Sequence, residues 1–378
     1  MTARASPWIH SRWLDGAFIL APPFFAVAFV LAFRDAFGDD SGVPLWAWVV
    51  FILAIDVAHV YSTLYRTYFD PVEFNARRTL YTVVPLLAWV GGALLYAAGP
   101  AVFWRVLAYI AVFHFVRQQY GFMVLYARRE RSVTLHRWID RSVIYLATIY
   151  PLVYWHTHPR QFHWFIEGDF FTLPAAVHAP VLAAYLLSLA AYAIKEAAAY
   201  RASGHVNWPK QYVVIGTAGA WYVGIVLLNG DMAFTVTNVV SHGIPYLALI
   251  WIYGRRQAQV TPARRLFGGL RSSYVFSVPF LPVFLGLLLL FAYVEEGLWH
   301  GLVWREHLSA FVGFADLPKL EDSAALALVV SLLAVPQLTH YILDGFIWKL
   351  KATNRNGGVR SNAAKPRSSA DIRPRSNR

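Results

Sequence analysis

The sequence predicts an all-α, polytopic membrane protein, a helix bundle of about ten transmembrane helices with both termini cytoplasmic. Three observations lead to this fold class: the composition, ten long apolar segments, and basic residues that gather in alternate loops. Hydrophobic residues make up 58% of the 378 residues and charged residues only 14%. Soluble domains of this length do not have that balance, so the chain is expected to cross a membrane many times.

The ten apolar segments set the expected elements. A hydrocarbon core about 30 Å thick needs about 20 apolar residues in a helix that rises about 1.5 Å per residue. Segments that meet or approach this length are 17–33, 44–65, 79–98, 101–127, 140–156, 175–199, 210–229, 231–253, 274–296 and 324–349. The first contains Pro22 and Pro23 and no clear cleavage site, so it is expected to be a retained helix. Residues 1–351 form one domain, because the pieces between segments are too short for cores of their own.

The net charge of +12 comes from arginine and lysine in alternate loops, which is a topology signal and not a sign of nucleic-acid binding. The basic residues are Arg66, Arg77, Arg78, Arg128, Arg129, Arg131, Arg137, Arg201, Lys210, Arg255, Arg256, Arg264, Arg265 and Arg271. The acidic loop residues are Asp35, Asp39, Asp40, Glu295, Glu296, Glu306, Asp316, Glu321 and Asp322. The positive-inside rule then places both termini in the cytoplasm of a bacterial cell, with the chain in the inner membrane. Residues 352–378 are rich in Arg, Ser, Asn and Pro, which predicts a disordered basic cytoplasmic tail next to anionic lipids.

Four histidines inside apolar segments each have a polar residue three or four positions away, and this is the main functional signal. The pairs are Asp56 with His59, His114 with Gln118, Asn238 with His242, and His340 with Asp344. Residues at that spacing share one face of a helix. Inside hydrocarbon such groups are costly unless they meet one another, a metal, a cofactor or water.

The expected topology brings these pairs to a similar depth. All four lie in segments expected to run from outside to inside, and counting from the outer ends puts the histidines roughly 17 to 24 Å deep. His59, His114, His242 and His340 are therefore proposed metal ligands, with Asp56 and Asp344 as ligands or partners of the imidazoles. A single histidine of this kind is more often a hydrogen-bonded helix-packing residue than a ligand, but four at one depth favour a common site.

Three further residues complete the predicted site. Gln118 and Asn238 would orient imidazoles. Arg117 would bind the head group of an amphiphilic substrate or pair with Asp56 or Asp344. A structural salt bridge within the membrane explains Arg117 equally well.

A second group of histidines, His156, His158 and His163, follows the fifth segment. These residues would bind a metal at the outer face or belong to an aromatic interfacial loop. The loop is favoured, because short histidine clusters without an acidic partner at a fixed spacing are poor predictors of metal sites.

Residue types and motifs that are missing from the sequence limit the chemistry that the site can perform. The chain has no cysteine, which excludes disulfides, iron-sulfur clusters and thiolate sites. A P-loop, a dinucleotide fingerprint, a Gly-x-Ser-x-Gly elbow and the histidine boxes of acyl-lipid desaturases are also missing. In its use of intramembrane histidines the chain resembles the bacterial membrane carotenoid dioxygenases. Its motif order differs from theirs, so the resemblance implies no residue roles.

Together these features predict a membrane metalloenzyme, with non-haem iron, another divalent metal or a di-metal site. Such an enzyme would oxidise or otherwise modify a lipid or isoprenoid, with membrane lipids and a lipophilic small molecule as partners. Two alternatives stay open. One is a redox protein that binds haem or a quinone, and the other is a proton-coupled transporter with a relay of histidine and aspartate within the membrane.

Overall fold

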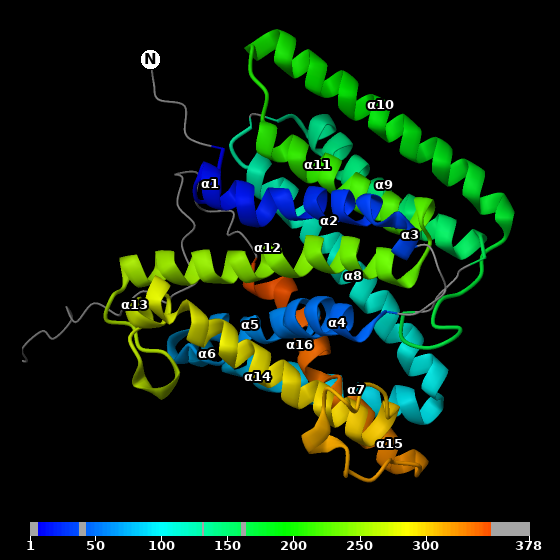
Figure 1. The fold of residues 1–378 in the computed structure, drawn as a ribbon. Coiled ribbons are helices and arrows are strands. Elements are labelled where there is room, and N and C mark those ends of the chain that lie inside the picture. Colours follow the sequence, from blue (N-terminus) through cyan, green and yellow to red (C-terminus); the bar gives the residue numbers. More distant parts are fainter. Residues whose placement is uncertain (1–6, 38–42, 131, 160–163, 349–378) are drawn as a thin grey trace, which may run out of the picture.

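The computed structural model describes residues 7–37, 43–130, 132–159 and 164–348, and Figure 1 shows how they are arranged. All regular structure in these ranges is helical, apart from one isolated bridge between Arg265 and Arg271. The predicted all-α architecture is confirmed for the described residues. Residues 352–378, predicted to be a disordered tail, lie outside the described residues.

The helices follow one another along the chain with short connections. In order they are α1 (Arg12–Asp15), η1 (Gly16–Leu20), α2 (Ala21–Ala32), α3 (Arg34–Phe37), α4 (Leu45–Ala47), η2 (Trp48–Val57), α5 (Ala58–Arg66), α6 (Pro71–Ala76), α7 (Arg78–Ala98), α8 (Pro100–Ala127), α9 (Thr134–Thr157), η3 (Ala175–Val177), α10 (His178–Ser203), α11 (Trp208–Trp221), η4 (Tyr222–Leu227), α12 (Asp231–Val260), η5 (Phe267–Gly269), α13 (Ser272–Val275), η6 (Val278–Phe280), α14 (Leu281–Trp299), η7 (His300–Trp304), η8 (Val312–Phe314), α15 (Ser323–Leu333) and α16 (Val335–Ile347). Of the η elements, η1, η2, η4 and η7 have π-helical hydrogen bonding and the others are 3₁₀ turns.

Local sequence explains where several helices begin and end. The side chains of Asp70, Asn207 and Asp322 accept hydrogen bonds from backbone N–H groups in the first turns of α6, α11 and α15. These groups have no partner within the helix, so capping stabilises each start. Helix α10 ends at Gly204, whose φ of 62° lies in the left-handed region that glycine adopts at little cost.

Seven helical stretches are long and apolar enough to cross a membrane: Arg12–Ala32, Leu45–Arg66, Arg78–Ala98, Pro100–Ala127, Ala175–Ser203, Asp231–Val260 and Val278–Trp304. The pair α15 and α16, bent by 43°, makes an eighth if it counts as one span. The two remaining predicted segments, 140–156 and 210–229, coincide with α9 and with α11–η4. Both are helical but do not meet the same length and hydropathy test. The described residues thus show seven or eight candidate spans, fewer than the expected ten.

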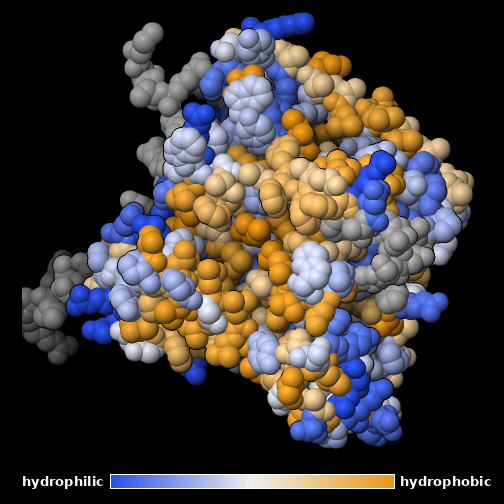
Figure 2. Space-filling model, viewed as in Figure 1, coloured by the Kyte–Doolittle hydropathy of each residue, from blue (hydrophilic) through white to orange (hydrophobic). Residues whose placement is uncertain are grey.

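Helix α12 is the centre of the bundle. Of its apolar window 78% is buried, against 22% for α7 and 17% for α10. In Figure 1 it crosses the middle of the molecule, with α2, α10 and α11 on one side and α5, α14 and α16 on the other. Apolar side chains spread across the middle of the face in Figure 2, and hydrophilic ones gather at its edges. Such a surface suits helices whose outer faces contact lipid.

Proline residues inside two helices leave backbone carbonyls that other side chains satisfy. Pro245 of α12 has no N–H for the carbonyl of Ser241, and the Gln119 side chain on α8 donates to that oxygen at 3.3 Å. In the same way Tyr68 donates to the carbonyl of Tyr81, four residues before Pro85, at 2.8 Å. The freed carbonyls therefore bind neighbouring elements instead of remaining unpaired in hydrocarbon.

One part of the charge interpretation is wrong. Glu295 and Glu296 were expected in a loop after the ninth segment, but both belong to helix α14 and are only 4% and 8% exposed. Lys210, also counted as a loop residue, lies in the first turn of α11 with a side chain that is 1% exposed. Buried charges such as these need partners within the bundle.

Candidate metal centre

The structure brings the four predicted histidines together. His59 on α5, His114 on α8, His242 on α12 and His340 on α16 each offer one ring nitrogen, and these four nitrogens lie within 4.8 Å of one another. All four side chains are buried, between 1% and 4% exposed. We call this group the histidine centre. Residues 281 positions apart in sequence meet here, because the four helices cross in the middle of the bundle.

His59 and His242 form the closest pair. Their Nε2 atoms lie 2.9 Å apart, so one proton is shared between the two rings when nothing else binds them. The Nδ1 atom of His59 lies 3.2 Å from the carbonyl of Ile55, and donation to that carbonyl leaves the Nε2 lone pair facing the centre. The π-helical η2 ends directly before α5, and π-helical turns often accompany functional sites.

The ring of His340 is held by a chain of hydrogen bonds that the sequence did not reveal. Its Nδ1 lies 2.8 Å from Oγ1 of Thr63 on α5, which in turn lies 2.9 Å from the hydroxyl of Tyr246 on α12. That hydroxyl donates to Oδ1 of Asp344 at 2.6 Å. Partners of this kind fix the orientation of an imidazole and leave its other nitrogen free to bind a ligand.

Several ring nitrogens have no other partner. Among the described residues, His114 Nε2, His242 Nδ1 and His340 Nε2 are buried without a hydrogen bond. Each buried unsatisfied group costs about 1 to 3 kcal/mol. One cation satisfies several such lone pairs at once, and metal–nitrogen bonds of about 2.1 Å require nitrogens up to about 4.2 Å apart. The residues therefore fit a metal ion after a small inward shift of the rings.

The two predicted aspartates lie beside the centre. Asp56 Oδ1 is 3.7 Å from Nδ1 of His59, and Asp344 Oδ2 is 3.7 Å from Nε2 of His114. Asp344 Oδ1 is also 4.0 Å from Nδ1 of His340. These distances are longer than hydrogen bonds, but they place two carboxyl groups next to the four rings. When ionised, the two carboxylates would compensate the charge of a divalent ion.

Gln118 and Asn238 lie near the histidines but bond to backbone. Gln118 Nε2 donates to the carbonyl of His242 at 3.1 Å, so it fixes the backbone that carries the ring and not the ring itself. Asn238 Nδ2 donates to the carbonyl of Phe234 at 3.1 Å, one turn earlier on α12. The Oε1 of Gln118 and the Oδ1 of Asn238 are buried without a partner among the described residues.

The structure does not bring Arg117 to the histidines. Its side chain is exposed at the surface of the bundle, where NH1 donates to the hydroxyl of Tyr145 on α9 at 2.7 Å. The guanidinium also lies 5.4 Å from the ring of Tyr120. The expected pairing of Arg117 with Asp56 or Asp344 is not seen.

An acidic cluster of Asp56, Glu295 and Glu296 lies near the centre, and its three carboxyl groups interact electrostatically. Asp56 was predicted as a site residue, whereas the two glutamates were expected in a loop. Glu295 accepts a hydrogen bond from Tyr61 at 2.7 Å, and Glu296 lies 3.6 Å from Nε2 of His300. No arginine or lysine pairs with the cluster among the described residues. In the sequence, this cluster could have been found from the two adjacent glutamates within the apolar run of α14.

The outer histidines form no metal site in the described part of the chain. Nδ1 of His156 lies 2.5 Å from the carbonyl of Leu152 and Nε2 lies 2.7 Å from the hydroxyl of Tyr109, so both of its nitrogens are occupied. His158 stacks on Tyr154 with ring centres 3.9 Å apart. Both histidines contact an aromatic residue, as expected, but His156 lies in the last turn of α9 and His158 is the C-cap of that helix, so the predicted loop begins later than expected. His163 lies outside the described residues.

Comparison with known proteins places the chain in no family. No family model, no curated protein and no solved structure matches it. The interpretation therefore depends on the geometry alone: a buried centre of four histidines that can hold a metal ion, inside a bundle of apolar helices.

Proposed function

We propose that this protein is an integral membrane metalloenzyme that oxidises or otherwise modifies a lipid or isoprenoid. The observation that carries the proposal is the convergence of four buried imidazole nitrogens within 4.8 Å. One ion can occupy such a space, so the proposal selects a single metal over a di-metal site. Imidazole ligands suit iron, zinc, copper and nickel, and non-haem iron is preferred here for oxidation chemistry.

The protein's own groups would hold and orient the reacting species. His59, His114, His242 and His340 would bind the ion, which when bound supplies activation of oxygen or of water. Thr63 and Tyr246 keep the ring of His340 in place. Asp344 accepts the proton of Tyr246 in a hydrogen bond and is placed to hold or release a proton beside the centre. The surrounding apolar helices exclude bulk water.

A lipophilic substrate follows from the location of the centre. The four histidines lie in spans or candidate spans whose outer surfaces are apolar. A hydrocarbon chain reaches such a site from the membrane, whereas a polar metabolite would have to lose its hydration. Because Arg117 lies away from the histidines, its proposed contact with a head group would occur at the bundle surface near Tyr145.

The packing of the rings disfavours haem. Ring centres of His59 and His242 are 4.6 Å apart, those of His114 and His340 are also 4.6 Å apart, and those of His114 and His242 are 4.9 Å apart. A porphyrin between two axial histidines would have to separate rings that here contact one another. We therefore favour a metal ion held by protein ligands alone.

Metal analysis of the purified protein tests the proposal. We expect about one ion per chain in the wild type and loss of most of it in His59→Ala, His242→Ala and His340→Ala variants. The exposed His205 provides the control, since His205→Ala should keep the full complement. A metal-free wild type, or a full metal content in all three variants, would contradict the proposal. A Soret absorption band would support haem instead.

The acidic cluster favours a second candidate, a proton-coupled transporter. Asp56, Glu295 and Glu296 are carboxyl groups within the helix bundle that have histidine neighbours but no arginine or lysine partner among the described residues, and such groups often carry protons. This candidate expects proton-coupled uptake in vesicles that Glu295→Gln abolishes, with no stoichiometric metal. Uptake that persists in Glu295→Gln would exclude it.

For topology we propose that α9 and α11–η4 also cross the membrane, which gives ten spans and two cytoplasmic termini in a bacterial inner membrane. The alternation of basic loops supports this arrangement. In α9 the polar residues gather at the start, with Asp140 as the one buried acidic residue. A span can contain such groups when they face neighbouring helices.

A further inference from the structure

A small cavity lies at the end of the bundle that carries the basic loops, between α5, α12 and residues 264–276, which include α13. Its lining includes Tyr65, Arg66, Arg264, Ser272 and Phe276. The cavity volume is about 10 Å³, which is space for roughly one water-sized species. This site shares no ligand residue with the histidine centre.

Three polar atoms of this lining are buried and have no partner among the described residues: Tyr65 Oη, Arg66 Nε and Ser272 Oγ. Their side chains are 6%, 7% and 2% exposed. A guanidinium N–H can only donate, and each hydroxyl can donate as well. Three groups that can donate a hydrogen bond, and that have no partner among the described residues, therefore line one small space.

The charges around the cavity do not balance. Asp70 is fully engaged, since both of its oxygens bond to Arg264 and Oδ1 also caps α6. Glu73 is shared between two arginines, with Arg77 at 3.3 Å and Arg66 at 3.9 Å. Arg77 does not line the cavity but is the nearer partner of Glu73, so Arg66 is left with the longest contact to a carboxylate. Its guanidinium also donates to the carbonyl of Ile347 at 3.3 Å and lies 3.9 Å from the ring of Tyr253, neither of which neutralises its charge. A buried charge of this kind calls for a counter-ion.

We propose that this cavity binds a single small anion of halide size, such as chloride. The anion accepts hydrogen bonds from Tyr65, Arg66 and Ser272 and balances the charge of Arg66. It joins α5, which carries Tyr65, Arg66 and His59, to α13, which begins at Ser272, beside the part of α12 that lines the cavity. A water molecule satisfies the same donors but leaves the charge uncompensated.

Anion-dependent stability tests the site. Full-length protein in detergent is unfolded by heat in chloride, bromide or gluconate at equal ionic strength. Gluconate is the control anion, because it is too large for the cavity. We expect the midpoint of unfolding to rise with chloride and to saturate. In the double variant Tyr65→Phe, Ser272→Ala the half-saturating chloride concentration should rise about tenfold or more, because two hydrogen bonds to a charged group are lost.

The neighbouring exposed serine supplies a matched control, and Ser273→Ala should respond to chloride as the wild type does. Bromide-soaked crystals give a second readout that does not depend on the variants folding. They should show an anomalous peak within hydrogen-bond distance of Ser272 Oγ. Equal midpoints in chloride and gluconate, the same chloride response in the double variant, or ordinary water density without a bromide peak would each overturn the proposal.

Discussion

At the scale of single residues, the histidine centre depends on side chains that hold the rings and not only on the rings. Thr63 joins His340 to Tyr246 across three helices. A metal ligand whose second nitrogen loses its partner can rotate away from the ion. Mutation of such partners typically lowers metal affinity by about 10- to 100-fold.

The Thr63→Val variant tests this role. Valine keeps the shape of threonine but removes the hydroxyl that contacts His340, so we expect the metal dissociation constant to rise by about 10-fold or more while the stoichiometry at saturation stays the same. Titration with Fe(II) or Zn(II) measures both. Thr82→Val on α7, where the hydroxyl bonds only to its own helix, is the control. Equal affinity in the two variants would contradict the role of Thr63.

Sequence reasoning found the four histidines and their two aspartates but not Thr63 or Tyr246. The histidines were found because polar pairs within apolar runs are visible along one helix. Thr63 contacts a histidine 277 positions away, and no spacing rule reports such contacts. Arg117 was expected at the centre because it lies three residues after His114. Three residues turn a helix to within only about 60° of the starting face, and here the side chain contacts α9.

At the scale of elements, the centre requires that α12 and η2 pack closely. A Cβ at Gly243, next to His242, would lie 2.7 Å from Cγ2 of Ile55 and 3.1 Å from its carbonyl. That carbonyl is also the partner of His59 Nδ1. The absence of a side chain at Gly243 thus allows the close approach of His242 and His59 in the histidine centre.

The Gly243→Ala variant should therefore be less stable and bind metal more weakly. Overpacking of this kind typically costs about 1 to 3 kcal/mol. Gly91→Ala on α7 is the matched control, because nothing lies within 4 Å of a Cβ there. Alanine in that helix should be neutral or stabilise by about 0.5 to 1 kcal/mol. If thermal unfolding shows equal changes for the two variants, the close approach at Gly243 is not important.

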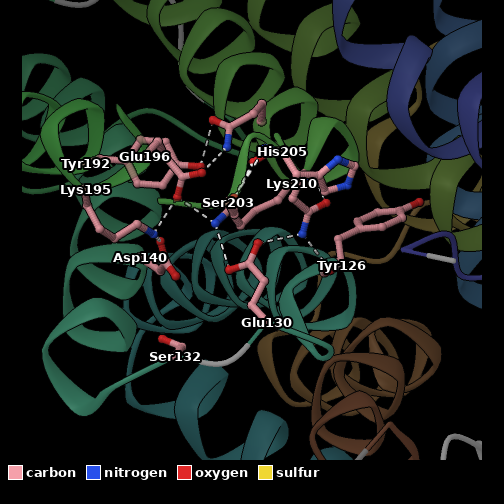
Figure 3. A network of polar contacts seen from close by, with 12 residues as sticks. Tyr126, Glu130, Ser132, Asp140, Tyr192, Lys195, Glu196, Ser203, His205 and Lys210 are labelled. Atoms are coloured by element: carbon pink, nitrogen blue, oxygen red, sulfur yellow. Dashed lines mark hydrogen bonds and ion pairs between the residues drawn. The ribbon is translucent and has the colours of Figure 1, made fainter. Parts of the chain in front are cut away.

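Buried ion pairs fix the peripheral helices α10 and α11. Lys195 bonds to Asp140 and Glu196, and Lys210 bonds to Glu130 at 2.9 Å and Glu196 at 2.7 Å. Figure 3 shows these side chains meeting from α9, α10, α11 and the turn after α8, which carries Glu130. The network holds α10 to the bundle at one end, although little of that helix is buried.

Replacement of Lys210 by methionine should destabilise the protein by at least about 2 kcal/mol, since two partly buried carboxylates lose a partner. Lys319→Met, at an exposed position outside the network, should change little. Unfolding by heat or denaturant in the same detergent compares the two. A Lys210→Met protein as stable as the wild type would show that the pairs contribute nothing net.

At the scale of the whole molecule, apolar runs predicted every long helix, because the length of a span follows from membrane thickness. Composition alone does not fix the number of spans, because α9 and α11–η4 are long enough to cross a membrane but contain polar residues that face other helices. Charged residues were expected in the loops between the apolar runs. This expectation fails for Glu295 and Lys210, which have partners inside the bundle.

The proposed topology has a direct test, because the chain contains no cysteine. Single cysteines at the exposed positions Ser203 and Ser309 should lie on opposite sides of the membrane. We expect a membrane-impermeant maleimide to label Ser309→Cys in intact cells and Ser203→Cys only after permeabilisation. The unmodified chain is the unlabelled control. Labelling of both in intact cells would contradict ten spans.

The contact between His59 and His242 has a consequence for how long the protein persists in a cell before it is degraded. Without an ion, the four rings share one hydrogen bond and three of their buried nitrogens have no partner among the described residues, which lowers the stability of the folded bundle. Any ligand that binds only the folded chain raises its stability by mass action. Chains made during metal starvation would therefore open more often and be degraded sooner. The supply of metal would then regulate how much of the protein accumulates, without any change in its gene's expression.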